Sequence, residues 1–210
     1  MKKLVIVGAG GHAKVVVDIL VSSGRGTDVL GFVDDDAAIH GQRRAGLPVL
    51  GALETLRESD VALVMGIGHN GARRRVFERA RSLGYDIVSV VHSTAVIAPR
   101  CQLGTGVVVM ANVAVNVDSN IGDNVVLNTA CSVDHDCVIA AHSHIAPGAH
   151  VAGNVSIGAE TLVGIGAVVI PGRRIGARCI IGAGAAVVDD VADDSVAVGV
   201  PARVVRLVSR

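Results

Sequence analysis

The chain has 210 residues, of which half are hydrophobic, and its 19 basic and 19 acidic residues give a formal net charge of zero. This length predicts one or two domains, and a neutral chain without a basic stripe argues against a nucleic-acid-binding protein. No apolar run is long enough to cross a membrane, and the apolar stretch after Lys3 is too short for a signal peptide. We therefore expect a cytoplasmic protein with no membrane partner.

Residues 1–88 alternate apolar runs with helical patterns, which predicts a Rossmann-like α/β domain with a small parallel sheet. The expected strands and helices are 4–7, 13–20 (helix), 29–33, 61–65, about 72–83 (helix) and 87–91.

Glycine and polar residues follow the first three of these strands, and ligands of such sheets bind at the carboxyl ends of the strands. The glycine loop at 8–12 has Ala13 where a dinucleotide fingerprint would have its last glycine. There is also no second half-domain for another nucleotide, so a nucleotide-linked sugar is favoured over NAD, with a purely structural turn as the alternative. The candidate contacts are Gly10, Gly11, His12, Asp34, Asp35, Gly68 and Asn70.

Three consecutive arginines, Arg73, Arg74 and Arg75, could form a diphosphate clamp. Neighbouring helix residues point in widely different directions, so all three cannot face one site. We expect a solvated helix face instead.

From residue 89 to 210 the pattern changes to a strict period of six, which favours an all-β solenoid in which each hexapeptide supplies one short strand and one corner. The aliphatic residues at this spacing are Val91, Ile97, Leu103, Val109, Val115, Ile121, Leu127, Val133, Ile139, Ile145, Val151, Ile157, Val163, Val169, Ile175, Ile181 and Val187.

Two further positions of the hexapeptide carry information. Glycine often follows the aliphatic residue, as at Gly104 and Gly122, where we expect a corner with unusual backbone dihedrals. The fifth position should be small and point inward, and all four cysteines occupy it, so we read them as small buried residues rather than zinc ligands. Arg173 breaks this rule after Pro171, which predicts a distorted corner there.

Four of the eight histidines fall between residues 135 and 150. His135 and Asp136 occupy a corner, whereas His144 and His150 should face outward. An outward histidine beside a carboxylate is a candidate general base, because imidazole titrates near neutrality. A polar surface corner and metal ligation through His142 and His144 are the alternatives.

Taken together, these motifs resemble those of the left-handed β-helix acyltransferases known as sialic acid O-acetyltransferases, and most closely the nucleotide-sugar 4-amine N-acetyltransferases among them. The resemblance covers nearly the whole chain. Its residues lie at 8–12, 34–35, 66–70, 128–129, 133–137, 153–154 and 199–203.

The resemblance implies a left-handed parallel β-helix, acetyl-CoA as co-substrate, no metal, and a homotrimer with active sites between subunits. It also implies that the amine attacks the acetyl group directly. His135 would be the general base, with Asp136 beside it and Asn128 orienting the substrate or the base. Gly153 would donate its N–H to the oxyanion, and the contacts to acetyl-CoA would be His144, Gly153, Ile165 and Gly182.

Three alternatives stay open from the residues themselves. The same fold could O-acetylate sialic acid or another sugar, since the nature of the nucleophile is not readable here. A β-helix metal hydratase and a non-catalytic sugar-nucleotide sensor are more remote. The nucleotide base, the sugar and any acyl group other than acetyl are likewise undetermined.

Overall fold

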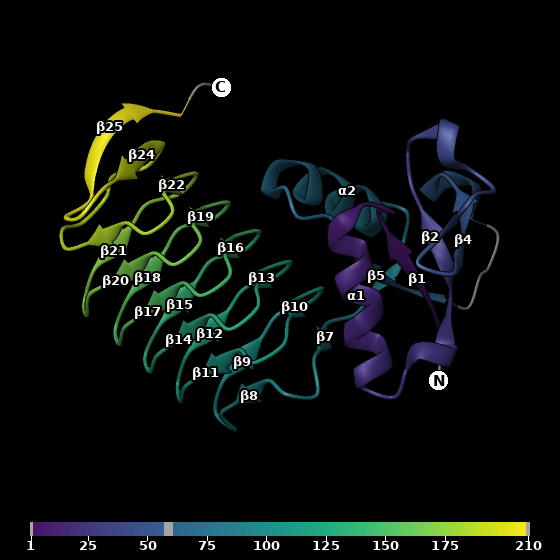
Figure 1. Cartoon of the computed structure of the whole chain (residues 1–210), viewed down its shortest axis with the longest axis horizontal. Coiled ribbons are helices and arrows are strands. Elements are labelled where there is room, and N and C mark those ends of the chain that lie inside the picture. The colour runs from purple at the N-terminus through teal and green to yellow at the C-terminus, as the bar shows by residue number, and fades with distance from the viewer. Residues whose placement is uncertain (1, 57–60, 209–210) are drawn as a thin grey trace.

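The structure, a computed structural model, describes residues 2–56 and 61–208. An N-terminal α/β domain is followed by a three-sided parallel β-helix whose coils lead away from it (Figure 1). The C-terminal strand lies at the end of the β-helix that is farthest from the α/β domain (Figure 1).

The α/β domain is built on a six-stranded sheet in the order β3-β4-β2-β1-β5-β6, in which the β3–β4 pair is antiparallel and the other pairs are parallel. Its elements are β1 (Lys3–Val7), α1 (Gly11–Ser22), η1 (Gly26–Asp28), β2 (Val29–Val33), η2 (Ala37–Ile39), β3 (Arg43–Arg44), β4 (Leu47–Gly51), η3 (Leu53–Thr55), β5 (Val61–Met65), α2 (Asn70–Ser82) and β6 (Asp86–Ile87), where η marks a short 3-10 turn.

Most of the expected elements are present. The strands expected at 4–7, 29–33 and 61–65 are confirmed, and both helices begin two residues earlier than expected. The single strand expected at 87–91 is wrong, because the chain leaves the front sheet after Ile87 and enters the β-helix at Val90. Ser89 lies between them, and its hydroxyl donates to Gly104 O of the next coil at 2.7 Å.

The β-helix has three faces. The first face holds β7 (Val90–Val91), β10 (Val108–Val109), β13 (Val126–Leu127), β16 (His144–Ile145), β19 (Leu162–Val163), β22 (Ile180–Ile181), β24 (Ser195–Val198) and β25 (Arg203–Leu207). The second face holds β8 (Val96–Ile97), β11 (Ala114–Val115), β14 (Ser132–Val133), β17 (His150–Val151), β20 (Val168–Val169) and β23 (Ala186–Val187). The third face holds β9 (Gln102–Leu103), β12 (Asn120–Ile121), β15 (Val138–Ile139), β18 (Ser156–Ile157) and β21 (Arg174–Ile175).

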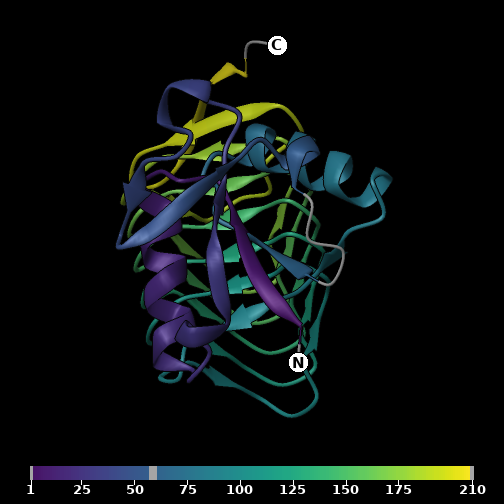
Figure 2. The same cartoon turned by 90° about the vertical axis from the view of Figure 1, so that its right-hand side faces the viewer.

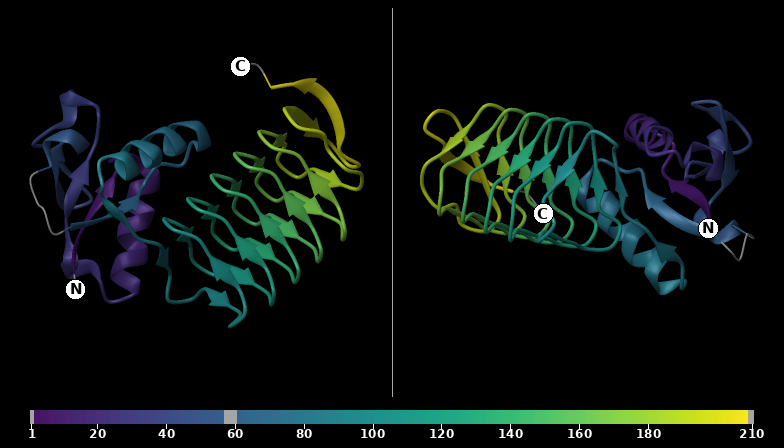
Figure 3. Two further views of the ribbon diagram at one scale, coloured as in Figure 1. Left: turned by 180° about the vertical axis from the view of Figure 1, so that it is seen from behind. Right: turned by 90° about the horizontal axis from the view of Figure 1, so that it is seen from below.

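Each coil stacks on the next with a register of 18 residues, as in the parallel pair of Val109 with Leu127. The second residue of each short strand points inward, and these aliphatic residues form one continuous core. Three of the four cysteines are buried in that core and Cys101 is partly buried, which confirms the inward position. Each six-residue repeat therefore forms one face of a three-sided coil (Figure 3).

We expected unusual backbone dihedrals at the glycines that follow the aliphatic residues, and this expectation is wrong. The left-handed backbone falls two residues later, at positions such as Asn112, Asp118 and Asp136, where asparagine and aspartate are tolerated. Gly122 instead lies against the next coil, and a Cβ there would be 2.8 Å from the backbone nitrogen of Ala141. Close approach of coils, rather than an unusual dihedral, requires these glycines.

The distortion expected at Arg173 is also wrong. Gly172 has a positive φ of 71°. The third corner residue of this edge also has a positive φ in earlier coils. The strand that follows keeps its register, with Ser156 paired to Arg174. The Arg173 side chain is half-buried and approaches Asp190 at 3.8 Å, so it leaves the core without moving the backbone.

The front domain covers the first coils of the first face. Outward residues of that face, among them Val108 and Val126, are buried in one cluster with Val16, Ile19 and Leu20 of α1. The two helices follow the β-helix at different places, α1 beside β7 and α2 farther along (Figures 1 and 2). Burial of this apolar surface fixes the position of the front domain on the β-helix.

Candidate active site

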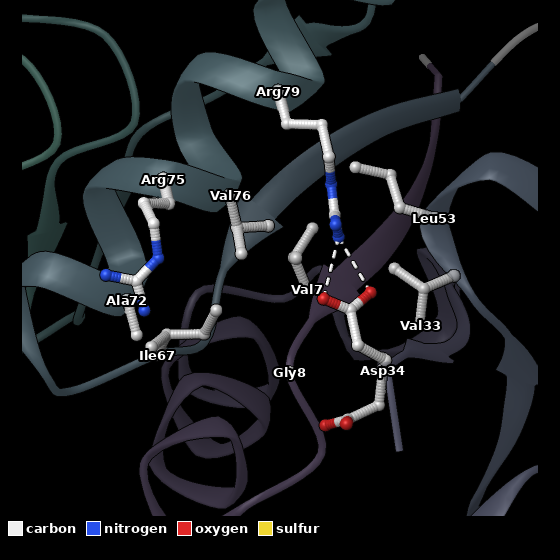
Figure 4. A pocket seen from close by; sticks show the side chains of 11 residues that line it. Val7, Gly8, Val33, Asp34, Leu53, Ile67, Ala72, Arg75, Val76 and Arg79 are labelled. Atoms are coloured by element: carbon white, nitrogen blue, oxygen red, sulfur yellow. Dashed lines mark hydrogen bonds and ion pairs between the residues drawn. The ribbon is translucent and has the colours of Figure 1, made fainter. Parts of the chain in front are cut away.

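A crevice of about 450 Å³ opens at the carboxyl ends of β1, β2 and β5 (Figure 4). Asp34 organises its glycine loop, because its carboxylate accepts from the backbone nitrogens of Ala9 at 2.8 Å and Asp36 at 3.0 Å. Gly8 has a φ of 94°, and a Cβ there would lie 2.9 Å from Ile67. Gly10 and Gly11 instead border a neighbouring hollow, which also has Asp34 in its wall.

Asp35 lines the crevice, where both its oxygens accept from Arg79 Nη2 of α2 at 2.7 and 2.9 Å. Arg79 Nε is also 3.1 Å from the Glu54 carboxylate. Val7, Val33 and Leu53 supply apolar walls. Sequence reasoning missed Arg79 and expected Arg75 on a solvated face, although helical spacing could have placed them together, since both line the crevice from one face of α2.

The three arginines of α2 have three different environments. The expected solvated face is wrong for Arg73, which is fully buried. Arg74 is exposed and pairs with Glu78 and Glu160. Arg75 borders the crevice and the larger cavity described below. Three successive residues of α2 therefore lie in the core, in solvent, and beside the crevice and the cavity.

A cavity of about 1020 Å³ lies between the start of α2 and the first face of the β-helix. It brings together six residues that the sequence suggested, namely Gly68, Asn70, Asn128, His144, Ile165 and Gly182. Asn70 is held in place by both domains, since its Nδ2 donates to Glu160 O at 3.0 Å and its Oδ1 accepts from Arg73 at 2.9 Å.

His144 is fixed by the residues on either side of its ring. Its Nδ1 lies 3.2 Å from Gly68 O, which can only accept, so Nδ1 carries the proton. Its Nε2 is then an acceptor, 2.9 Å from Asn128 Nδ2. Burial, followed by the charge of Arg73, lowers the pKa of His144 to about 4, so the ring is neutral near pH 7.

His12 lies beside His144, with the two ring centroids 6.1 Å apart in an edge-to-face arrangement. Burial and the Arg73 charge lower the pKa of His12 to about 4 as well. Its Nε2 is buried and has no hydrogen-bond partner within residues 2–56 and 61–208. A polar ligand atom reaching this point would satisfy it.

His135 lies at the corner between β14 and β15 and is exposed. Its Nδ1 is 2.8 Å from Asp136 Oδ2, which leaves Nε2 for chemistry. The hydrogen bond that the His135 ring donates to Asp136 is the main cause that raises the pKa of His135, and the charge of Asp134 adds to it. Asp134 is itself held by Asn116 Nδ2 at 2.7 Å and accepts from the His135 backbone nitrogen at 2.8 Å.

Gly153 lies directly under the His135 ring, one coil further along. A Cβ at this position would be 2.6 Å from both Cε1 and Nε2 of the ring. The backbone of Gly153 is not in the left-handed region, and Val117 and Pro171 occupy the same corner position two coils earlier and one coil later. Space for the imidazole is therefore what requires a glycine here.

One chain does not bring all the candidate residues together. His144 and Asn128 face outward from the first face, whereas His135 and Gly153 lie on the edge between the second and third faces. In a three-sided prism that edge is opposite the first face. His150, on the second face, lies 2.8 Å from Ser132 Oγ and borders neither the crevice nor the cavity.

Comparison with known proteins relates this geometry to a family. The family described as the PglD N-terminal domain matches residues 3–80. A GDP-perosamine N-acetyltransferase from Escherichia coli O157:H7 is 31% identical over 156 residues, which cover 71% of this chain and 70% of that protein. The chain belongs to the nucleotide-sugar N-acetyltransferases. A second member of this family, a UDP-N-acetylbacillosamine N-acetyltransferase from Bacillus subtilis (strain 168), is 33% identical over 53% of this chain, a match that spans 52% of the relative's length.

Solved N-acetyltransferase structures match over almost the full length. One is a histidine-to-asparagine variant of perosamine N-acetyltransferase from Caulobacter crescentus, in complex with CoA and GDP-perosamine. It is 42% identical, with a TM-score of 0.91 and 97% of each chain covered. The acetyltransferase domain of PglB from Neisseria gonorrhoeae FA1090, in complex with acetyl coenzyme A, is 36% identical, with a TM-score of 0.89 and coverage of 97% of this chain and 99% of that one. The left-handed β-helix of this N-acetyltransferase is thus that of its family.

Residues 2–56 and 61–208 contain neither a membrane-spanning helix nor a metal-binding cluster. No helix in these ranges is long and apolar enough to span a membrane. No group of three or more histidine, cysteine, aspartate or glutamate residues in them is arranged to hold a metal ion.

Proposed function

We propose that this chain transfers the acetyl group of acetyl-CoA to the 4-amine of a nucleotide-linked amino-dideoxy sugar. The main observation behind the proposal is that the His135–Asp136 pair lies against Gly153. The chain also has the fold of an N-acetyltransferase that was solved with CoA and GDP-perosamine. The crevice at the front domain would hold the nucleotide, and the cavity along the first face would hold the acyl donor.

In the proposed reaction the sugar amine attacks the thioester carbonyl while His135 Nε2 accepts the amine proton. Asp136 holds Nδ1 and stabilises the imidazolium that forms. The Gly153 N–H donates to the oxyanion. When the tetrahedral intermediate collapses, the C–S bond breaks and the CoA thiolate takes up the proton that His135 received, which leaves the thiol and a neutral imidazole. One such N–H donor contributes about 3 kcal/mol to lowering the barrier. Apart from the two substrates, the reaction uses only side chains and backbone groups of the protein.

The substrate roles of the front domain follow from its geometry. Asp34 positions the glycine loop through backbone hydrogen bonds, whereas Asp35 and Arg79 present an acceptor and a donor inside the crevice. The apolar walls around them suit a flat nucleobase. His12 Nε2 is free to bond the sugar, which would extend from this crevice toward the cavity.

We further propose a homotrimer whose active sites lie between subunits. A single chain places His135 on the edge opposite its own cavity, so a neighbour must bring the base to the donor. The outward residues Val96, Val138 and Ile165 of the β-helix are 68%, 50% and 61% exposed, and association would cover such apolar surface. A closed ring of identical subunits satisfies both requirements. We place the enzyme in the cytoplasm, where free thiols such as those of Cys131 and Cys137 persist.

The deciding experiment measures thiol release from acetyl-CoA with UDP-, GDP- and dTDP-linked 4-amino sugars and with free sialic acid. Wild type and His135→Ala are compared, with His150→Ala as a control on the second face. Turnover of one amino sugar that is lost only in His135→Ala supports the proposal. Turnover of sialic acid alone, or full activity in His135→Ala, contradicts it.

A further inference from the structure

Arg73 is a fully buried cation that has no carboxylate partner within residues 2–56 and 61–208. Its guanidinium donates only to neutral oxygens, and these belong to both domains. The acceptors are Ile67 O at 3.3 Å, Gly68 O at 2.9 Å, Asn70 Oδ1 at 2.9 Å, Asn124 O at 3.1 Å, His142 O at 2.8 Å and Ser143 O at 3.1 Å. Burial lowers the pKa of Arg73 to about 10, which leaves it charged near neutrality.

The two ends of this guanidinium bind different parts of the molecule. Nη1 holds the carbonyls of Ile67 and Gly68, at the end of the loop that leads from β5 into α2. Nη2 holds the carbonyls of His142 and Ser143, at the corner that precedes β16 of the β-helix. A planar fork with five N–H groups can join four carbonyls in this way, and an ammonium cannot.

The loop held by Nη1 borders both substrate sites. Ile67 lines the crevice, whereas Gly68 lines the cavity. Gly68 O also accepts from Nδ1 of His144, so one carbonyl receives Arg73 and His144 together. The position of Arg73 therefore sets the spacing between crevice and cavity and the proton position on His144.

We propose that Arg73 is a positioning residue, which holds the 67–68 carbonyls against the β-helix so that His144 keeps its Nδ1–H tautomer and the two substrate sites keep their spacing. The expected loss of rate rests on the proposed function, whereas the statement about the His144 tautomer does not. Direct transfer depends on the reacting atoms being held about 3–3.5 Å apart, and a displacement of about 1 Å costs roughly 100-fold in rate.

Electrostatics supports the same role. Arg73 contributes to the lowered pKa values of both His12 and His144, so the buried charge helps keep two neighbouring rings neutral. The other titratable groups around His144 are His12 from α1, His69 and Arg75 from the start of α2, and Glu160, Arg178 and Asp194 from the β-helix.

The test compares Arg73→Met and Arg73→Lys with Arg74→Met, a matched control on the same helix that also loses a contact to the β-helix, at Glu160. Arg73→Met should lower kcat by about 100-fold, with smaller changes in KM, and raise the pH at which His144 titrates. Arg73→Lys keeps the charge and loses the fork, so kcat should fall while His144 stays neutral. Arg74→Met should leave kcat and the His144 titration unchanged.

Nitrogen-15 NMR of the histidine rings in the wild type provides a second test that needs no variant to fold. His144 should show protonated Nδ1 and unprotonated Nε2, with no titration between about pH 6 and 8. An Nε2–H tautomer, a ring that titrates in this range, or wild-type kcat in a folded Arg73→Met would overturn the inference. Loss of acetyl transfer from every acceptor would instead overturn the proposed function and leave the His144 result standing.

Discussion

At the scale of residues, the environment of each histidine determines its chemistry. His135 is exposed beside two aspartates, and its pKa is raised mainly by the hydrogen bond that it donates to Asp136. His12 and His144 are packed near Arg73, and their pKa values fall to about 4. A histidine that takes up a proton must be accessible and stabilised as the cation, so of these three His135 suits a general base.

The pKa direction at His135 predicts the pH dependence of acetyl transfer. Because the base must be neutral, activity should rise with pH through a pKa above the ordinary histidine value of 6.5. Asp136→Asn removes the carboxylate that stabilises the imidazolium, so the acidic limb of kcat/KM should move to lower pH and the plateau should fall. Rate profiles from pH 5 to 9 test this. An acidic limb that stays in place in Asp136→Asn would contradict the role of the pair.

Gly153→Ala should separate two roles of this glycine. The substitution keeps the backbone N–H that would bind the oxyanion, but its Cβ would lie 2.6 Å from the His135 ring. We expect the ring to be displaced and kcat to fall by roughly 100-fold. The rate of His135 modification by diethyl pyrocarbonate reports the displacement directly. Val117→Ala, at the same corner position two coils earlier, is the control. An unchanged kcat in Gly153→Ala would show that the position of the His135 ring does not depend on a glycine there.

At the scale of elements, the coil of the β-helix makes two distinct demands on its corners. One position takes a left-handed backbone, which glycine, asparagine and aspartate all adopt, as Gly148, Asn112 and Asp118 show. At Gly122, in another position of the hexapeptide, the chain lies so close to the next coil that a Cβ would be 2.8 Å from backbone nitrogen. The two kinds of glycine stand two residues apart in the hexapeptide and differ in what can replace them.

Substitution of both kinds of glycine by asparagine should therefore give different stabilities. Gly148→Asn places a tolerant residue at φ 62° with open space around it, and should change the free energy of unfolding by no more than about 0.5 kcal/mol. Gly122→Asn forces the coils apart and should cost about 1–3 kcal/mol. Thermal unfolding of the two variants side by side measures the difference. Equal melting temperatures would mean that the coils can separate at no cost.

At the scale of the whole molecule, the three-sided coil separates the base from the cavity of the same chain. The front domain is fixed on the first face by the packing of α1, so its crevice opens on that side. His135 projects from the opposite edge. An active site made from both must join two subunits.

This separation predicts complementation between inactive variants. His135→Ala keeps an intact crevice and cavity, whereas His12→Ala keeps an intact base. If sites form between subunits, mixed trimers of the two should regain about a quarter of wild-type activity, because random assembly pairs two intact halves at about one site in four. Co-expression followed by the thiol-release assay measures it. Activity no higher than that of the two variants separately would place each site within one chain.

Much of this was predictable from sequence because the β-helix repeats a local rule. A period of six with inward aliphatic residues at Val109 and Leu127 specifies the coil without any knowledge of distant contacts. The strands β1, β2 and β5 were also predictable, since buried parallel strands are short apolar runs, whereas β3 and β4 were not among the expected elements. The split at 87–91 was not, because Ile87 and Val90 belong to different sheets and both are apolar.

The sequence by itself determined the fold class, the corner that carries His135 and Asp136, and the glycine crevice, because each depends on residues near one another in the chain. Only the tertiary structure decided that Arg73 is buried, that Gly68 meets His144 across 76 positions, and that Arg79 pairs with Asp35. These contacts depend on how α2 docks against the sheet and the β-helix. No local pattern records which turn of a helix will face another domain.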